Sequence, residues 1–249
     1  PNQTIKVDQD LSINIKDVLD FEISAGEAAP ILAARLATGT ALNEKLPGIN
    51  MRLGSTIGTN ALLERKGART SLIVTSGFKD LLLIRDQQRP DIFSLNIPDK
   101  EPLYKDVHEI QERMSANGNC INKLDANHIN TTIKKLRKNK TESIAISFLH
   151  SYLNQDHEKI LRNKLKEEGF QYITGSAGIA PVINYLNRTE TATVNAYLDP
   201  KVREYLSKVF ENIPDGGLKV MTSAGGLVDY KHFLPKDSLF SGPAGGIVG

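Results

Sequence analysis

The sequence predicts an α/β protein with mixed, largely parallel sheets and flanking helices. Strand patterns rich in β-branched residues, such as residues 70–75, alternate with helical patterns along much of the chain. The clearest alternation of helix and strand runs from residue 127 to residue 173. Several strand patterns also end in glycine-rich turns. Strands that recur after helices need crossover connections, which place them parallel in one sheet.

The first part of the chain carries a strand signal and a helix signal. Residues 4–23 alternate apolar and polar side chains, which indicates short strands or a hairpin. Ser24, with Glu27 three residues later, is a typical N-cap pair. The apolar residues of the following turns share one face, and Gly39 is expected to end this helix.

A strand, a loop and a helix are predicted next, followed by a second strand. The expected elements are a strand at Met51 and Leu53, a loop over 54–60, a helix over 61–66 that Gly67 ends, and a strand over 70–75. The polar stretch 85–90 lies between apolar segments, and such loops often carry function.

The second half repeats helices and strands. The expected helices cover 127–138, 156–168 with a stop at Gly169, and 189–210 with an interruption near Pro200. The expected strands cover 143–149, 172–173 and 218–221.

Composition argues against several classes of partner. The chain has 31 basic and 29 acidic side chains and a net charge of +2, so neither nucleic acid nor a membrane surface is an expected partner. No apolar run approaches the roughly 20 residues that cross a bilayer. The single cysteine, Cys120, has no partner for an internal disulfide, which favours a cytoplasmic protein. No initiating Met precedes Pro1, and we expect a piece of a longer protein that is inactive alone.

Two glycine-rich segments follow or precede regular elements. Residues 222–226 follow an apolar strand, and residues 241–246 precede an expected helix start at Ile247. Glycines allow close approach of an anion to the backbone, and amides at a helix start attract phosphate. Both segments are therefore candidates for phosphate binding, with tight packing as the alternative. Neither is a Walker A loop, because the Gly-Lys-Ser/Thr ending is absent.

Residues 54–60 offer hydroxyls and an amide ahead of a helix. The alternatives are a capped helix start, with Thr59 or Asn60 as N-cap, and a ligand site. Glu64 is expected to be an ion-paired surface residue rather than a general base, and no other general base or metal site is predicted.

Several runs resemble the hydantoinase A and 5-oxoprolinase family, from about residue 26 to the end. They are GTNALLERKG at 58–67, GFKDLL at 77–82, Gln87 with RPD at 89–91, LHSYLN at 149–154, HE at 157–158, NAYL at 195–198, TSAGGL at 222–227 and SGPAGG at 241–246. The resemblance implies a family N-terminal region over 1–185 and the start of the hydantoinase A domain over 186–249.

The resemblance also implies an actin-like, ribonuclease-H-type ATPase architecture that binds ATP with Mg²⁺. The implied nucleotide contacts are Ser223, Gly225, Gly226, Gly242, Gly245 and Gly246. The implied substrate contacts are Thr56, Thr59, Asn60, Arg85, Gln87 and Arg89. Members of the family open small cyclic amides such as 5-oxoproline or a hydantoin by phosphorylating the carbonyl oxygen, in some cases with a hydantoinase B-type subunit or domain.

The chain departs from the family pattern in two places. No Asp-x-Gly-Gly-Thr phosphate turn precedes Gly26, and Arg85 and Asp86 stand where relatives often have a small and an aromatic residue. Two alternatives therefore stay open beside the hydrolase: the nucleotide-binding part of an ATP-dependent ketone carboxylase, and a non-catalytic interaction module.

Overall fold

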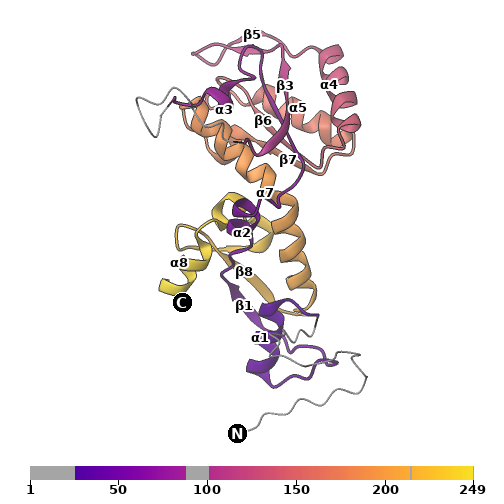
Figure 1. Cartoon of the computed structure of the whole chain (residues 1–249), viewed down its shortest axis with the longest axis vertical. Helices are drawn as coiled ribbons and strands as arrows, with labels where there is room; N and C mark the ends of the chain where they lie inside the picture. The colour runs from indigo at the N-terminus through magenta and orange to yellow at the C-terminus, as the bar shows by residue number, and fades with distance from the viewer. Residues whose placement is uncertain (1–25, 88–100, 214, 249) are drawn as a thin grey trace, which may run out of the picture.

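The computed structural model describes residues 26–87, 101–213 and 215–248, and these form two sheet bodies joined by one long helix (Figure 1). The predicted strands over 4–23, and Ser24, lie outside the described residues. None of the helices in the described ranges combines the length and the apolar composition that a membrane crossing requires.

The upper body contains a four-stranded parallel sheet with the order β3-β2-β6-β7. Its strands are β2 (Thr70–Thr75), β3 (Tyr104–Ile110), β6 (Ser143–Ser147) and β7 (Tyr172–Gly175). Every residue of β2 and β6 is buried, as expected for central strands covered on both faces. The short hairpin of β4 (Arg113–Met114) and β5 (Cys120–Asn122) follows β3.

Helices cover both faces of this sheet. On one face, α4 (Ala126–Lys138) and α5 (Asp156–Glu167) bury Ile133 and Leu161 against Ile144. On the other face, α7 (Tyr185–Glu211) packs Ala192 and Ala196 against the alternate residues of the strands. Two one-turn helices complete this body, α3 (Leu81–Ile84) and α6 (Ser176–Ile179).

The lower body is built around the sheet β1-β8-β9. Here β1 (Asn50–Leu53) pairs in parallel with β8 (Gly217–Met221), and β8 turns back into β9 (Leu227–Asp229) as an antiparallel hairpin. The surrounding helices are α1 (Ala29–Thr38), α2 (Ile57–Leu63), η1 (Tyr230–His232), η2 (Pro235–Ser238) and α8 (Ser241–Val248). The core includes Leu198, Leu206 and Val209 from the second half of α7.

Several predicted element boundaries need correction. α7 runs unbroken through Pro200, because Leu198 and Val202 on either side are buried in the core and hold the helix in place. Ala28 occupies the N-cap position of α1, and the Glu27 carboxylate instead forms an ion pair with Arg35 at 2.8 Å. Gly39 ends α1 in the left-handed conformation, as predicted.

Candidate functional site

A pocket of about 490 Å³ lies where β1 and β8 end, at the edge that carries the carboxyl ends of both parallel strands. This is the edge at which α/β folds usually bind ligands. The pocket brings together four of the predicted phosphate contacts. Its lining consists of Arg52, Leu53, Gly54, Met221, Gly225, Leu227, Gly242, Gly245 and Gly246.

α8 begins at Ser241, so the predicted helix start at Ile247 is wrong and three of the glycines lie within the helix. The glycines allow α8 to approach the segment after β1. A Cβ added to Gly242 would lie 2.8 Å from Thr56 Cγ2, and one added to Gly54 would lie 3.2 Å from the Ser241 carbonyl. Gly246, by contrast, has no atom within 4 Å of such a Cβ, so its side of α8 faces open space.

Ser223, Gly225 and Gly226 form the turn between β8 and β9. Gly225 has a φ of +80°, which explains the glycine at this position. The Ser223 hydroxyl donates to the Asp237 carbonyl at 2.7 Å and accepts from the Phe240 amide at 3.0 Å. Ser223 therefore ties this turn to the segment that leads into α8.

Thr56, Thr59 and Asn60 lie at the start of α2, not in a loop before it. The predicted N-caps Thr59 and Asn60 are wrong because α2 begins at Ile57. The Thr59 hydroxyl donates to the Leu239 carbonyl at 2.5 Å, and the Asn60 amide lies 3.5 Å from the Thr56 hydroxyl. Thr56 and Asn60 line a second pocket of about 420 Å³, together with Lys66 and Lys201.

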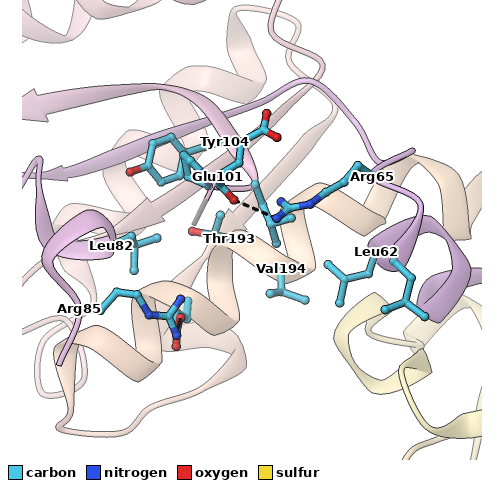
Figure 2. Close-up of a pocket in the computed structure, with 12 residues that line it drawn as sticks. Leu62, Arg65, Leu82, Arg85, Glu101, Tyr104, Thr193 and Val194 are labelled. Atoms are coloured by element: carbon cyan, nitrogen blue, oxygen red, sulfur yellow. Dashed lines mark hydrogen bonds and ion pairs between the residues drawn. The ribbon is translucent and has the colours of Figure 1, made fainter. Parts of the chain in front are cut away.

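Arg85 lies in the upper body and lines a third pocket of about 500 Å³, shown in Figure 2. Its guanidinium forms an ion pair with Glu190 of α7 at 2.7 Å. Arg85 and Gln87 have φ angles of +54° and +57°, which are unusual for residues with a side chain and are often retained at functional sites. Arg89 lies outside the described residues, and none of the described pockets contains both Arg85 and a predicted phosphate contact.

Arg52 is a site residue that the sequence predictions missed. It is exposed at the edge of the glycine-lined pocket, and within the described part of the chain it has no ion-pair partner. The signal was its place between half-buried Met51 and buried Leu53, where a charged side chain is directed to the opposite face.

Arg188 and Glu158 anchor a second group of polar contacts, at the carboxyl ends of β6 and β7. Arg188 is fully buried and donates to the carbonyls of Phe148, Leu149 and Val182 at 2.7 to 2.8 Å. Glu158 accepts from the Phe148 amide at 3.2 Å and from the Ser176 hydroxyl at 2.6 Å. These residues fix the loop after β6.

The ion pair predicted for Glu64 is present: its carboxylate lies 2.7 Å from Lys66 Nζ on the surface.

Burial lowers the pKa of Arg188, and the negative charge of Glu158 acts in the opposite direction. Within the described ranges no group of three or more His, Cys, Asp and Glu side chains is arranged to hold a metal ion.

Several known proteins are similar to this chain in sequence or in fold. The 5-oxoprolinase of Saccharomyces cerevisiae is 39% identical over 230 residues, which cover 80% of this chain and 18% of that protein. The gamma subunit of acetophenone carboxylase from Aromatoleum aromaticum is 26% identical over 251 residues, covering 92% of this chain and 34% of the subunit.

The crystal structure of the ATP-dependent caprolactamase from Pseudomonas jessenii superposes with a TM-score of 0.72 and 26% identity, covering 86% of this chain and 33% of that one. The predicted α/β class with largely parallel sheets is therefore confirmed. The chain spans less than a fifth of the yeast relative.

Family profiles match nearly all of the described sequence. The profile of the hydantoinase/oxoprolinase N-terminal region covers residues 22–169, and the hydantoinase/oxoprolinase profile covers residues 188–249. The chain belongs to the hydantoinase/oxoprolinase family.

Proposed function

We propose that this chain is the part of an ATP-dependent cyclic-amide hydrolase that holds phosphate groups of ATP. The observation that carries the proposal is the glycine-lined pocket at the ends of β1 and β8, with Arg52 at its edge. The similarity to 5-oxoprolinase and to caprolactamase supports the same activity, with 5-oxoproline or a hydantoin-type ring as substrate.

The residues present fit a polyphosphate. Gly225, Gly245 and Gly246 carry no side chain that would keep an anion from the backbone, and the space beside Gly246 is open. Arg52 supplies a cation that presents planar N–H donors to phosphate oxygens. Ser223 holds the β8–β9 turn rather than contacting phosphate directly, because its hydroxyl is already bonded to the segment before α8.

The residues of this chain bind and position the nucleotide and the substrate. ATP supplies the phosphoryl group that converts the oxygen of a resonance-stabilised amide into a leaving group. Mg²⁺ would neutralise phosphate charge, as in other phosphoryl-transfer enzymes. Arg52 offsets negative charge at one end of the pocket. We propose that Thr56 and Asn60, which line one pocket together with Lys66 and Lys201, contact the reacting end of the substrate.

Arg85, Gln87 and Arg89 are proposed to bind the anionic group of a substrate such as the carboxylate of 5-oxoproline. The observation in support is the pocket that Arg85 lines with Arg65 and Thr193. We expect catalytic turnover only from the whole protein, in which the remaining regions and a hydantoinase B-type subunit or domain are present. We further propose that residues 1–185 and 186–249 are two family regions, and that the protein is cytoplasmic.

Calorimetry with a non-hydrolysable ATP analogue and Mg²⁺ tests the phosphate site. Arg52→Gln should weaken binding roughly tenfold, because one charge-assisted contact is lost. Gly246→Glu should abolish binding through charge repulsion. Gly178→Glu is the matched control, since Gly178 is likewise exposed with no atom within 4 Å of an added Cβ. Equal affinity for all variants would refute the assignment of this pocket.

The similarity to a carboxylase gamma subunit favours one alternative, an ATP-dependent ketone carboxylase. Product analysis with the whole protein separates the two reactions: hydrolysis converts the cyclic amide into an open-chain acid, whereas carboxylation incorporates labelled bicarbonate into a ketone. If neither the whole protein nor this chain binds ATP, both enzymatic proposals are wrong and the non-catalytic interaction module is the remaining alternative.

A further inference from the structure

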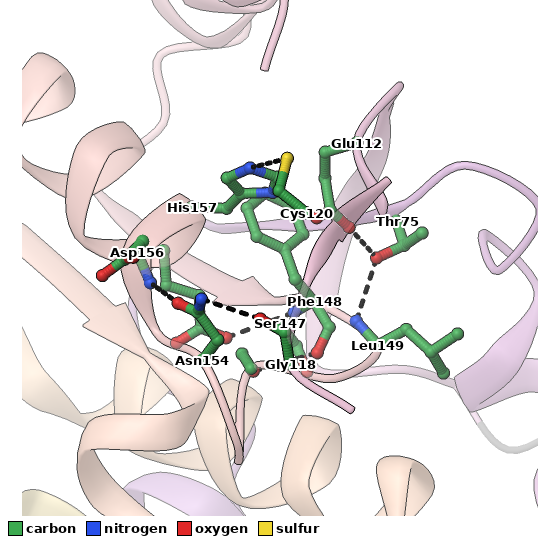
Figure 3. A network of polar contacts seen from close by, with 12 residues as sticks. Thr75, Glu112, Gly118, Cys120, Ser147, Phe148, Leu149, Asn154, Asp156 and His157 are labelled. Carbon is green, nitrogen blue, oxygen red and sulfur yellow. Dashed lines mark hydrogen bonds and ion pairs between the residues drawn. The ribbon is translucent and has the colours of Figure 1, made fainter. Parts of the chain in front are cut away.

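We propose that Cys120, His157 and Glu112 form a thiol–imidazole–carboxylate relay that makes Cys120 a reactive site for low-molecular-weight disulfides. The three side chains come from three separate elements: β5, the first turn of α5, and the turn between β3 and β4. Figure 3 shows them converging above the end of β6. None of the three belongs to the glycine-lined pocket.

The distances define the direction of the relay. Cys120 Sγ lies 3.6 Å from His157 Nε2, and His157 Nδ1 lies 2.7 Å from Glu112 Oε2. A carboxylate oxygen only accepts hydrogen bonds, so Nδ1 carries the proton of the neutral ring. Nε2 is then the acceptor that faces the thiol. This tautomer is the one that can remove the proton of Cys120.

The surroundings hold the relay in place. Glu112 and His157 are 3% and 5% exposed, and the other Glu112 oxygen accepts from the Thr75 hydroxyl. Thr75 Oγ1 in turn accepts from the Leu149 amide at 3.0 Å. Burial of Glu112 and His157 keeps water from competing for their hydrogen bond.

Cys120 itself is exposed, so a solute can reach its sulfur. The hairpin that carries it is tied to the loop before α5, because Asn154 Nδ2 donates to the Gly118 carbonyl at 3.0 Å. The same Asn154 accepts from the Asp156 amide at 2.9 Å, which fixes the start of the helix that carries His157. An accessible thiol is thereby held beside a buried base.

Several titratable groups near the relay make contacts of their own. On α5, Glu158 turns toward Ser176 and the Phe148 amide, and Asp156 lies at the exposed helix start. On α7, Tyr185 donates to the Ser147 carbonyl; its own burial, and further the charge of Glu112, raise the pKa of Tyr185. Arg188 lies beyond Tyr185, with its guanidinium 5.1 Å from the Tyr185 ring.

The reaction is a thiol–disulfide exchange. His157 Nε2 takes the thiol proton, and the Cys120 sulfur attacks one sulfur of the disulfide. The S–Cys120 bond forms as the disulfide bond breaks, and the leaving thiolate takes the proton back from Nε2. Cys120 is oxidised to a mixed disulfide and one small thiol is released, so no further oxidant is needed.

The test measures the rate of mixed-disulfide formation between the chain and an aromatic disulfide reagent as a function of pH. Cys120 is the only cysteine in the sequence, so the released chromophore reports this site alone. An unassisted thiol titrates near pH 8.5. We expect the folded chain to react roughly tenfold faster at pH 6.5 than His157→Gln, with similar rates near pH 9.5.

Two comparisons keep the outcome interpretable. His232→Gln is the matched control, because His232 is exposed and far along the chain from the relay. The unchanged protein unfolded in concentrated urea supplies a second comparison that does not depend on a variant folding, and it should follow the ordinary thiol profile. If the folded protein, the unfolded protein and His157→Gln share one pH profile, Glu112 and His157 are only a structural cross-link and the proposal is wrong.

Discussion

Replacing Arg188 with methionine should cost a large part of the stability of the upper body. The Arg188 guanidinium satisfies the carbonyls of Phe148, Leu149 and Val182, and its Nε donates to the Ser176 hydroxyl at 3.1 Å. A buried acceptor left without a partner costs about 1 to 3 kcal/mol. Two of the carbonyl contacts are only partly buried, so the low end of that range applies to them.

We therefore expect Arg188→Met to lower the free energy of unfolding by about 3 to 4 kcal/mol. Removal of the buried cation recovers some desolvation energy, because burial of Arg188 already disfavours its charged form and lowers its pKa. A net stability of 5 to 15 kcal/mol is typical, so this loss is a large fraction of the total.

Urea unfolding followed by circular dichroism measures this change, which suits a chain without tryptophan. Arg137→Met is the matched control, since the Arg137 side chain is 56% exposed and bonds Glu168 at the surface; its loss should be below about 1 kcal/mol. Arg188→Lys should fall between the two, because an ammonium cannot reproduce the planar fork. A loss for Arg188→Met no greater than that of Arg137→Met would refute the reasoning.

Three further changes have defined outcomes. Gly58→Ala should destabilise the lower body by about 1 to 3 kcal/mol in thermal or urea unfolding, because the new Cβ would lie 1.8 Å from the Oγ of buried Ser238. Asp106 is desolvated, but hydrogen bonds from His108, Ser71 and Asn139 lower its pKa to about 2. Because the pKa of Asp106 is lower in the folded than in the unfolded state, the ionised carboxylate stabilises the fold above pH 4, and this stabilisation is lost between about pH 4 and pH 2. In Asp106→Asn, the free energy of unfolding should fall by about 2 kcal/mol less over this pH range, as measured by unfolding at a series of pH values. Arg85→Gln should change stability by less than about 1 kcal/mol in the same assay, because its ion pair with Glu190 is part-exposed.

Each of these predictions has a clear contrary result. Gly178→Ala is the control for Gly58→Ala, since no atom lies within 4 Å of the added Cβ, and equal stabilities would contradict the steric argument. An unchanged acid limb in Asp106→Asn would show that other carboxyl groups set the acid transition. A loss of several kcal/mol in Arg85→Gln would mean that the residue holds the fold rather than a ligand.

Secondary structure could be predicted from the sequence where the local residue pattern was distinct. The strand over 70–75 was predicted at its observed bounds, because a short run rich in β-branched residues indicates a buried central strand. β3 was missed, since its charged side chains at Lys105, Asp106 and Glu109 obscure the pattern of an edge strand. The start of α8 was misplaced because glycine is a poor helix former and its role here is close packing.

In the candidate site, too, local segments could be predicted from the sequence, but their arrangement in space could not. The glycine-rich segments 222–226 and 241–246 were recognised one by one, but their meeting at one pocket depends on the pairing of β1 with β8, which no local pattern reveals. Arg52 was missed for that reason. The buried contacts of Arg188 and Glu158 were likewise hidden, because a charged residue in a helical pattern is more often at the surface.

The pairing of β1 with β8 also sets the order in which this chain can fold. The upper body is inserted between the two halves of the lower body, so the lower body is discontinuous in sequence. During synthesis β1 emerges early, and β8, its partner among the described strands, follows only at Gly217, after the upper body has been made. A ribosome-bound chain that ends after α7 should therefore protect β2 and β6 from hydrogen exchange while β1 remains unprotected.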